Sequence, residues 1–361
     1  MCLFQTSKQN IMLKTLDGLR GYAAILVLIA HIPLVSNTVL GELIYNSLKF
    51  LRVGYISVDM FFVLSGFLIT RNLIKQRSFK STISFKKFYV NRILRLFPVY
   101  LLVVLLSWLF IDNRHLIDSL LYFTNFTFSF DHTAHPLRHT WSLSIEEHFY
   151  LLWPVLIYFF GNKKNLRFII YITLIIISSS LLFFFISFQE DVIIKLIQKS
   201  SSTRILSLVG GGTLAFFERD VSNLQNPKGL LKWAFAFFLF ATFSRLILGN
   251  GVLYISTMYL FSFLGCITTF TYVLNVENTN SLSNKILTNR GAQFFGKISY
   301  SLYLIHYPIF YSYGMTKQQS QINEQIFFSL EQVFIVILIC ILTSTFSFYF
   351  IERPFLKYKI R

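Results

Sequence analysis

The stretch LDGLRGYAAILVLIAHIPL, residues 16–34, has the length and composition of a membrane-spanning helix, although it contains Arg20 and His31. These two residues are eleven positions apart, which on an α-helix is three turns plus roughly 20°, so both lie on one face about 16 Å apart. Charged groups within a membrane span are costly and usually point into a bundle interior or a wet cavity. The spacing therefore predicts a helix face with a fixed cation near one membrane surface and a titratable base toward the other.

Each of the two residues also has a simpler interpretation. Arg20 can extend to the lipid headgroups while its stem lies along apolar surface, and His31 can be a hydrogen-bonded residue at the membrane interface. A single helix does not decide between these alternatives, so the rest of the chain has to.

The composition is that of a membrane protein with several spans. Of the 361 residues, 54% are hydrophobic and only 14% are charged, which excludes an ordinary soluble enzyme. Lys and Arg in cytoplasmic loops explain the formal net charge of +17, so we expect no nucleic-acid partner. The three cysteines are scattered and form no disulfide framework or CxxC metal pattern.

Ten apolar runs are long enough to span a bilayer, and basic residues orient them. The segment from Arg71 to Arg95, both included, contains eight Lys and Arg residues and no acid. This marks a cytoplasmic loop and, by alternation, places both termini in the cytoplasm. The apolar segment 116–130 is short and is expected to be re-entrant or interfacial. We predict an all-α, polytopic transmembrane bundle that forms a single domain over residues 1–361. The predicted spans are 16–34, 55–74, 95–111, 144–160, 166–188, 204–218, 231–249, 252–275, 294–315 and 330–351.

This topology assigns each loop to a side of the membrane. Loops at 161–167, 218–232 and 285–290 and the segment from 352 onward are expected in the cytoplasm. The loops expected outside are 35–52, 112–143, 189–203, 249–251 and 316–329.

Arginine residues gather at the predicted cytoplasmic surface. NRILRLFP, residues 91–98, brings Arg92 and Arg95 to the start of the third span, and Arg20 lies at the cytoplasmic end of the first. The planar guanidinium makes charge-assisted, bidentate hydrogen bonds to phosphate, so three such side chains could hold a polyphosphorylated ligand. The alternative is that Arg92 and Arg95 only set the topology.

Two predicted spans carry acidic residues. Glu146 and Glu147, in HTWSLSIEEHFYLLWP (139–154), fall in the first turn of the predicted fourth span, where the helix dipole favours acids. The functional interpretation is that one carboxylate orients or charges His31 and strengthens it as a general base. In the second span, Asp59 is a candidate polar contact inside the site, and Ser65 precedes Gly66, which predicts a close helix approach.

Near the C-terminus, ISYSLYLIHYPIF (298–310) places Ser301, Tyr303 and His306 in a span. Ser65, Ser301 and Tyr303 are candidate donors for a developing oxyanion. The histidine-rich stretch DHTAHPLRH (131–139) matches no zinc-ligand spacing, so we expect no metal.

Taken in order, these stretches resemble the acyltransferase family 3 membrane proteins, which are bacterial O-acyltransferases of cell-surface carbohydrates. RILSLVGGGTLAFF (204–217) is similar to the Arg-led, glycine-rich sixth span of that family, and the usual EEQFY segment reads EEHFY here, with His148. The resemblance covers nearly the whole chain. The other matching segments are LDGLRGYAAILVLIAH, DMFFVLSGFLI, NRILRLFP, WSLSIEEHFYLLWP, ISYSLYLIHYP and the final ERP.

The resemblance implies transfer of an acyl group, usually acetyl from cytosolic acetyl-CoA, to a hydroxyl of a surface polysaccharide or lipid-linked glycan. It implies a multi-pass protein of the bacterial inner membrane, surrounded by membrane lipid. In the family the residues matching Arg20 and His31 are essential, the pair matching Arg92 and Arg95 is associated with the donor, and Glu146 is the acid of the SLSxE motif. The chain stops at Arg361, so we expect none of the SGNH-hydrolase-like domain that some relatives carry.

The expected mechanism places the donor phosphates at the arginines and uses His31 as the general base, which is worth about 10²–10⁴ in rate. A covalent acyl-histidine intermediate stays open. The alternatives from other classes are a polytopic glycan or lipid carrier, which would not depend on acetyl-CoA, and a proton-coupled transporter that uses His31 and Asp59 as a relay. Transporters of that kind often show internal repeats, and the sequence has none.

Overall fold

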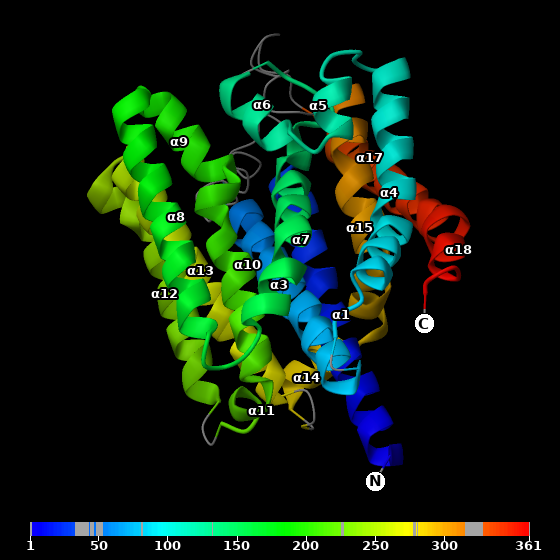
Figure 1. The fold of residues 1–361 in the computed structure, drawn as a ribbon. Coiled ribbons are helices and arrows are strands. Elements are labelled where there is room, and N and C mark those ends of the chain that lie inside the picture. The colour runs from blue at the N-terminus through cyan, green and yellow to red at the C-terminus, as the bar shows by residue number, and fades with distance from the viewer. Residues whose placement is uncertain are drawn as a thin grey trace. The chain divides into compact units, whose positions relative to one another are not determined.

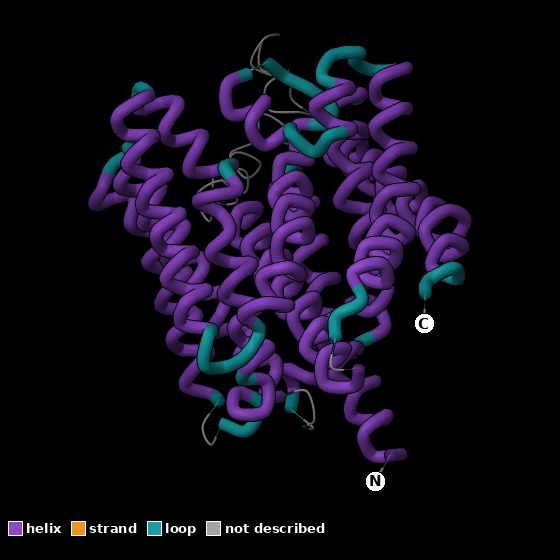
Figure 2. The backbone as a smooth tube through the Cα atoms, in the orientation of Figure 1, coloured by secondary structure: helices purple, strands orange, loops and turns teal. Residues whose placement is uncertain are grey.

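The computed structural model describes residues 2–32, 43, 47, 53–80, 82–131, 133–224, 227–276, 279, 281–314 and 328–360. Within these ranges every regular element is a helix (Figures 1 and 2). The all-α prediction is therefore confirmed. The predicted outer loops at 35–52 and 316–329 lie largely outside the described residues.

Six helices in the described part of the chain are long and apolar enough to cross a membrane. Helices α1 (Cys2–Ala30), α7 (Trp141–Phe160), α10 (Ser201–Phe216) and α15 (Arg290–Ser312) lie at the other four predicted spans and are not among these six. The protein is thus a multi-pass membrane protein, and the ten-span topology stays a prediction. The six helices are α3 (Val53–Lys80), α4 (Phe85–Phe110), α8 (Leu166–Ser187), α12 (Lys228–Leu248), α13 (Val252–Val276) and the run that starts with α17 (Leu330–Ser347) and ends at Leu356.

The apolar segment 116–130 folds as two short helices, α5 (Leu116–Leu120) and α6 (Thr124–Phe130). Tyr122, between them, has a left-handed backbone with φ of 58°, which interrupts the helix. Neither helix approaches the roughly 20 residues that a span requires, so the segment forms no spanning helix, and its re-entrant or interfacial placement stays a prediction.

The helices pack as two compact units, and α1, α3, α7 and α15 contribute residues to both. Unit 1 consists of residues 1–23, 55–83 and 145–296, and unit 2 consists of residues 24–54, 84–144 and 297–361. Besides the helices already named, unit 1 contains α9 (Glu190–Lys199), α11 (Glu218–Val221) and α14 (Leu282–Thr288), and unit 2 contains η1 (Arg138–Thr140), the π-helix η2 (Phe348–Glu352) and α18 (Arg353–Leu356).

Loops that were predicted on the same side of the membrane meet at one end of unit 1. Polar contacts there join the C-terminal part of α3, the loop after α7, helix α11 and the end of α13. At the other end of unit 1, two predicted outer loops meet, because Glu190 Oε1 accepts a hydrogen bond from Val252 N at 3.3 Å. This grouping supports the predicted alternation of loops within unit 1. The contacts are Arg71 Nε–Glu218 Oε2, Lys163 Nζ–Asp220 Oδ2 and Asn275 Nδ2–Val221 O, at 2.8, 3.0 and 2.6 Å.

Helices α3 and α10 of unit 1 approach each other backbone to backbone. A Cβ atom on Gly66 would lie 1.9 Å from Leu208 O, and one on Gly211 would lie 2.0 Å from Val63 O. The close helix approach predicted at Gly66 is confirmed, and it sets the spacing at which polar groups of the two helices meet.

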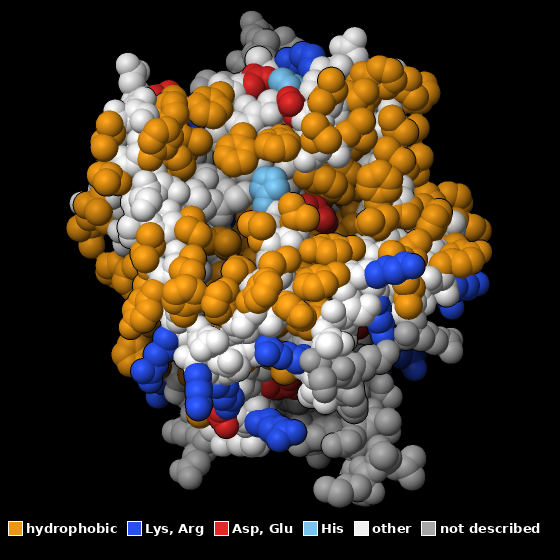
Figure 3. Space-filling model, viewed as in Figure 1, with side chains coloured by type: hydrophobic (Ala, Val, Ile, Leu, Met, Phe, Trp, Pro, Cys, Tyr) orange, Lys and Arg blue, Asp and Glu red, His pale blue; other side chains and the backbone are white. Residues whose placement is uncertain are grey.

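The outer surfaces of α8 and α12 are apolar. Figure 3 shows hydrophobic side chains over these helices, which is the surface that a lipid bilayer, and not water, would cover. Exposed side chains there include Ile175, Leu182, Ile186, Phe235, Leu246 and Ile247.

Candidate active site

His31 follows directly on the last turn of α1, in unit 2, and its backbone N–H donates to Leu28 O at 3.1 Å. Its Nδ1 lies 2.8 Å from Val27 O. A carbonyl oxygen only accepts hydrogen bonds, so Nδ1 carries the proton in this contact. In the neutral ring Nε2 is therefore the basic nitrogen, which is the form that a general base requires.

Five aromatic side chains of unit 2 contact one another and form what we call the histidine cluster: His31, His139, His306, Tyr303 and Tyr307. The His31 ring lies 5.0 Å from the ring of His306 and 5.3 Å from that of Tyr307. His139 lies 5.3 Å from His306 and stacks on Tyr307 at 5.1 Å. Residues from α1, η1 and α15 therefore converge at one place within unit 2.

Two imidazoles of the histidine cluster present buried nitrogens that have no hydrogen-bond partner among the described residues, namely His139 Nδ1 and His306 Nε2. The other nitrogen of each ring donates to a carbonyl of α15: His306 Nδ1 to Leu302 O at 3.0 Å and His139 Nε2 to Leu304 O at 3.1 Å. Each neutral ring thus directs a lone pair into an interior where only 4% of His139 and 1% of His306 are exposed. Such lone pairs suit a hydroxyl donor.

His139 lies in η1, before α7, and burial lowers its pKa to about 3, with the charge of His31 acting in the same direction. It therefore stays neutral at physiological pH. Tyr303 links it to α15 and α7, because its hydroxyl donates to His139 O at 2.9 Å and lies 2.5 Å from Ser142 Oγ.

Of the residues predicted on α15, Tyr303 and His306 belong to the histidine cluster and Ser301 does not. The buried Ser301 hydroxyl donates to Glu352 Oε2 at 3.2 Å and lies 3.3 Å from Ser347 Oγ. Sequence reasoning considered His139 only as part of a metal pattern, and it did not single out Tyr307. The signal that was available is the direct succession of His306 and Tyr307 on one helix.

The arginines predicted to bind phosphate are divided between the units. Arg20 belongs to unit 1, where its Nη1 makes an ion pair with Asp17 Oδ1 at 3.0 Å. Arg92 and Arg95 lie on α4 in unit 2, half-buried and three residues apart, so they are neighbours on the helix surface. Sequence reasoning missed Asp17 as the partner of Arg20.

Glu146 lies on α7 in unit 1 and accepts two hydrogen bonds, from Ser65 Oγ of α3 at 3.1 Å and from Tyr150 at 2.5 Å. Helix α7 starts at Trp141, after the turn of η1, and has no acid in its first turn. The interpretation of Glu146 and Glu147 as first-turn residues is therefore wrong. The predicted pairing of Glu146 with His31 stays a prediction.

Asp59 is fully buried in α3 of unit 1 and accepts hydrogen bonds from Arg204 Nη2 at 2.7 Å, Ser207 Oγ at 2.9 Å and Ser262 Oγ at 2.7 Å. The Arg204 guanidinium also lies 3.8 Å from the centre of the Tyr259 ring. These contacts join α3, α10 and α13 through one carboxylate. Arg204 opens the glycine-rich sixth segment, which was the signal for a buried cation.

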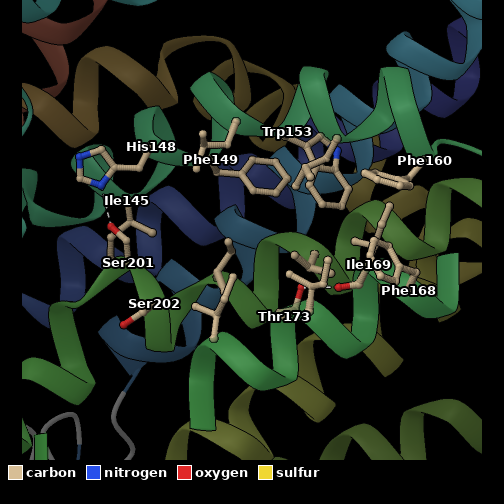
Figure 4. A pocket seen from close by; sticks show the side chains of 16 residues that line it. Ile145, His148, Phe149, Trp153, Phe160, Phe168, Ile169, Thr173, Ser201 and Ser202 are labelled. Atoms are coloured by element: carbon tan, nitrogen blue, oxygen red, sulfur yellow. Dashed lines mark hydrogen bonds between the residues drawn. The ribbon is translucent and has the colours of Figure 1, made fainter. Parts of the chain in front are cut away.

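An apolar cavity of about 230 Å³ lies among α7, α8 and α10 of unit 1 (Figure 4). Trp153 and Phe168 line its walls, and at one end His148 Nδ1 lies 2.7 Å from Ser201 Oγ. No Lys or Arg is among the residues that line it, so the cavity suits a hydrocarbon chain and not a phosphate group.

Among the residues that the structure describes, no group of three or more His, Cys, Asp and Glu side chains is arranged to hold a metal ion. The imidazoles of the histidine cluster can transfer a proton to and from a bound hydroxyl.

Comparison with known proteins gives matches along nearly the whole chain. A family model described as an acyltransferase domain matches residues 13–352. The O-acetyltransferase OatA of Staphylococcus aureus is 30% identical over 372 aligned residues, which cover 95% of this chain and 57% of that protein. The peptidoglycan O-acetyltransferase OatA of Listeria monocytogenes is 28% identical over 379, covering 95% and 56%. The chain thus spans just over half the length of these relatives, and no solved structure matches it.

Proposed function

The chain belongs to acyltransferase family 3, and from this premise we propose that it is a membrane O-acetyltransferase that moves an acetyl group from acetyl-CoA to a hydroxyl of a cell-surface glycan. The relatives that are named O-acetyltransferases, one of them of peptidoglycan, support the reaction and the class of acceptor. The apolar helices support a location in a membrane with lipid around the bundle, which we propose is the bacterial inner membrane. The donor is taken from the cytoplasm and the acceptor from outside.

His31 is the proposed general base. Its Nε2 removes the proton of the acceptor hydroxyl as the hydroxyl oxygen attacks the thioester carbonyl, the carbon–sulfur bond breaks, and protonated His31 returns the proton to the departing thiolate. The hydrogen bond from Nδ1 to Val27 O supports this role because it leaves Nε2 as the basic nitrogen. An acyl-histidine intermediate on the same nitrogen would use the same geometry.

The single observation that carries this proposal is the pair of buried lone pairs beside His31. His139 Nδ1 and His306 Nε2 have no partner among the described residues, and an unsatisfied buried polar atom costs about 1–3 kcal/mol. A hydroxyl of the acceptor would satisfy one of them and would lie next to the base. Tyr303 positions His139, because the Tyr303 hydroxyl donates a hydrogen bond to the backbone carbonyl of His139.

Arg20, Arg92 and Arg95 are the proposed ligands of the donor phosphates, because bidentate guanidinium contacts suit phosphate oxygens. Phosphates held at the cytoplasmic surface would leave the thioester end of the donor free to extend into the membrane domain.

Four polar residues are proposed to position the helices that carry the reacting groups, namely Asp59, Ser65, Glu146 and Ser301. The carboxylate of Asp59 already accepts hydrogen bonds from two helices other than its own, and Ser65 donates to Glu146. Each of these contacts fixes one helix against another, which supports a positioning role more directly than contact with substrate.

The test is the incubation of membranes with acetyl-CoA labelled in the acetyl group, followed by isolation of the wall glycan. We expect label in the glycan, lost on mild alkaline treatment as an ester is, and about 10²–10⁴ less of it in His31→Ala. Glycan that stays unlabelled, with export of unmodified glycan dependent on the protein, would favour the carrier. Proton flux that depends on His31 and Asp59 without labelling would favour the transporter.

A further inference from the structure

The segment after α18 in unit 2 returns to the start of α4. Asn91 Nδ2 donates to Ile360 O at 3.0 Å, and Ile360 N donates to Asn91 Oδ1 at 2.7 Å. A side-chain amide that both donates to and accepts from one residue fixes that residue in place. Helix α18 also packs against α4, beside which it lies in Figure 1.

This return places Lys359 among the arginines of α4. Burial, and then the neighbouring Arg95 and Arg92, lower the pKa of Lys359 to about 8, while the carboxylate of Glu352 acts in the opposite direction. Lys359 is half-buried, and Glu352 is almost fully buried on η2. Lys359 therefore lies within electrostatic range of two arginines in the N-terminal half of α4, and one acid offsets their charge in part.

Like charges held together destabilise a fold unless an anion compensates them. The chain nevertheless uses a two-way hydrogen bond next to Lys359 to hold it beside Arg92 and Arg95. Such an arrangement is typical of a site for a ligand that carries several negative charges, where lysine serves as a compact point charge beside the bidentate arginines.

We propose that Lys359 is a fourth phosphate-binding residue of the donor site, beside the three arginines, so that the segment after α18 forms one wall of the site for the phosphates of coenzyme A. This inference rests on the proposed function, because it takes coenzyme A as the polyanion. It adds a residue that the sequence motifs of the family resemblance do not include, and it gives the C-terminal segment a role in binding.

Binding of free coenzyme A tests the inference without turnover. The full chain, purified in detergent or nanodiscs, is titrated with coenzyme A by calorimetry at about pH 7 as wild type, Lys359→Ala and Lys357→Ala. Lys357 is the matched control, since it lies two residues earlier, is exposed, and loses the same charge. We expect the Kd to rise about tenfold in Lys359→Ala and less than twofold in Lys357→Ala.

The pH dependence separates a phosphate contact from a structural role. Between about pH 7 and pH 9.5 the wild-type affinity should fall as Lys359 loses its proton, because its pKa is about 8. Lys359→Arg keeps its charge throughout this range, so its affinity should stay nearly constant. A lysine that only packs the tail against α4 would leave the two pH profiles the same.

The outcomes distinguish the two levels of the proposal. No binding of coenzyme A by the wild-type protein would overturn the proposed function itself. Wild-type binding together with equal affinities of Lys359→Ala and Lys357→Ala would overturn only the role of Lys359. If Lys359→Ala does not fold, the comparison of wild type with Lys359→Arg across pH decides the question.

Discussion

Removal of the Asp59 carboxylate is the perturbation whose cost the structure defines most fully. Asp59 and the Arg204 side chain are 0% and 3% exposed, and 2.7 Å separates their charged atoms. Asp59→Leu would leave a buried guanidinium without its counter-ion and two serine hydroxyls without their acceptor. Breaking such a pair from one side costs roughly 3–5 kcal/mol.

The double variant Asp59→Leu with Arg204→Met removes both charges, and apolar replacement of a buried pair is often neutral or stabilising. Its free energy of unfolding should therefore return to within about 1–2 kcal/mol of wild type. Ser207 and Ser262 can bond back to carbonyls of their own helices. Thermal unfolding in detergent, followed by the fluorescence of a thiol-reactive dye or by circular dichroism, measures both effects.

Acetyl transfer by the same double variant decides what Asp59 does. If the carboxylate only holds α3, α10 and α13 together, the stable double variant should keep most of the acetyl-transfer activity. If Asp59 takes part in the reaction, the double variant will be stable and inactive. A single variant Asp59→Leu that unfolds at the wild-type temperature would refute the reasoning from burial and pairing altogether.

Three further predictions concern packing, acid stability and acceptor binding. Gly66→Ala should lose about 1–3 kcal/mol of stability because its Cβ would meet Leu208 O, whereas Gly229→Ala, with nothing within 4 Å, should not; equal melting temperatures would contradict this. Burial lowers the pKa of His135 to about 4, so from pH 6.5 downward the unfolded chain binds a proton that the folded chain does not, and at pH 5 this should cost about 2 kcal/mol. The melting temperature of His135→Asn should then depend less on pH than that of the wild type. The same pH dependence in both proteins would contradict this prediction. His306→Phe should reduce glycan labelling about tenfold without altering coenzyme A affinity. Unchanged labelling with a weaker affinity for coenzyme A would contradict a role of His306 in acceptor binding.

The fold class followed from the sequence because its signals are local. The length of an apolar run, the excess of Lys and Arg in a loop and a glycine before a helix contact all act within a few residues. They predicted the helices, the short segment 116–130 and the close approach at Gly66. The start of α7 was predicted three residues late because the η1 turn continues into the helix at Trp141, and nothing in the apolar pattern marks that continuation.

The candidate site was only partly accessible from the sequence because its members lie far apart along the chain. His31 and His306 were predicted from their positions in apolar helices, but their contact joins residues 275 positions apart. Arg204 as the partner of Asp59 and Lys359 as the neighbour of Arg92 depend on tertiary packing in the same way. Local patterns name residues with unusual chemistry, and the fold decides which of them meet.

Chemical rescue of His31→Gly tests the central claim most directly, since it asks whether an imidazole at this position is what the reaction needs. Purified protein would be supplied with labelled acetyl-CoA, a glycan acceptor and increasing concentrations of free imidazole, with His148→Gly as the matched control. The account predicts a loss of about 10²–10⁴ in transfer for His31→Gly, partly restored by imidazole in a saturable manner, and little response of the control. Transfer by His31→Gly at the wild-type rate without imidazole would contradict it.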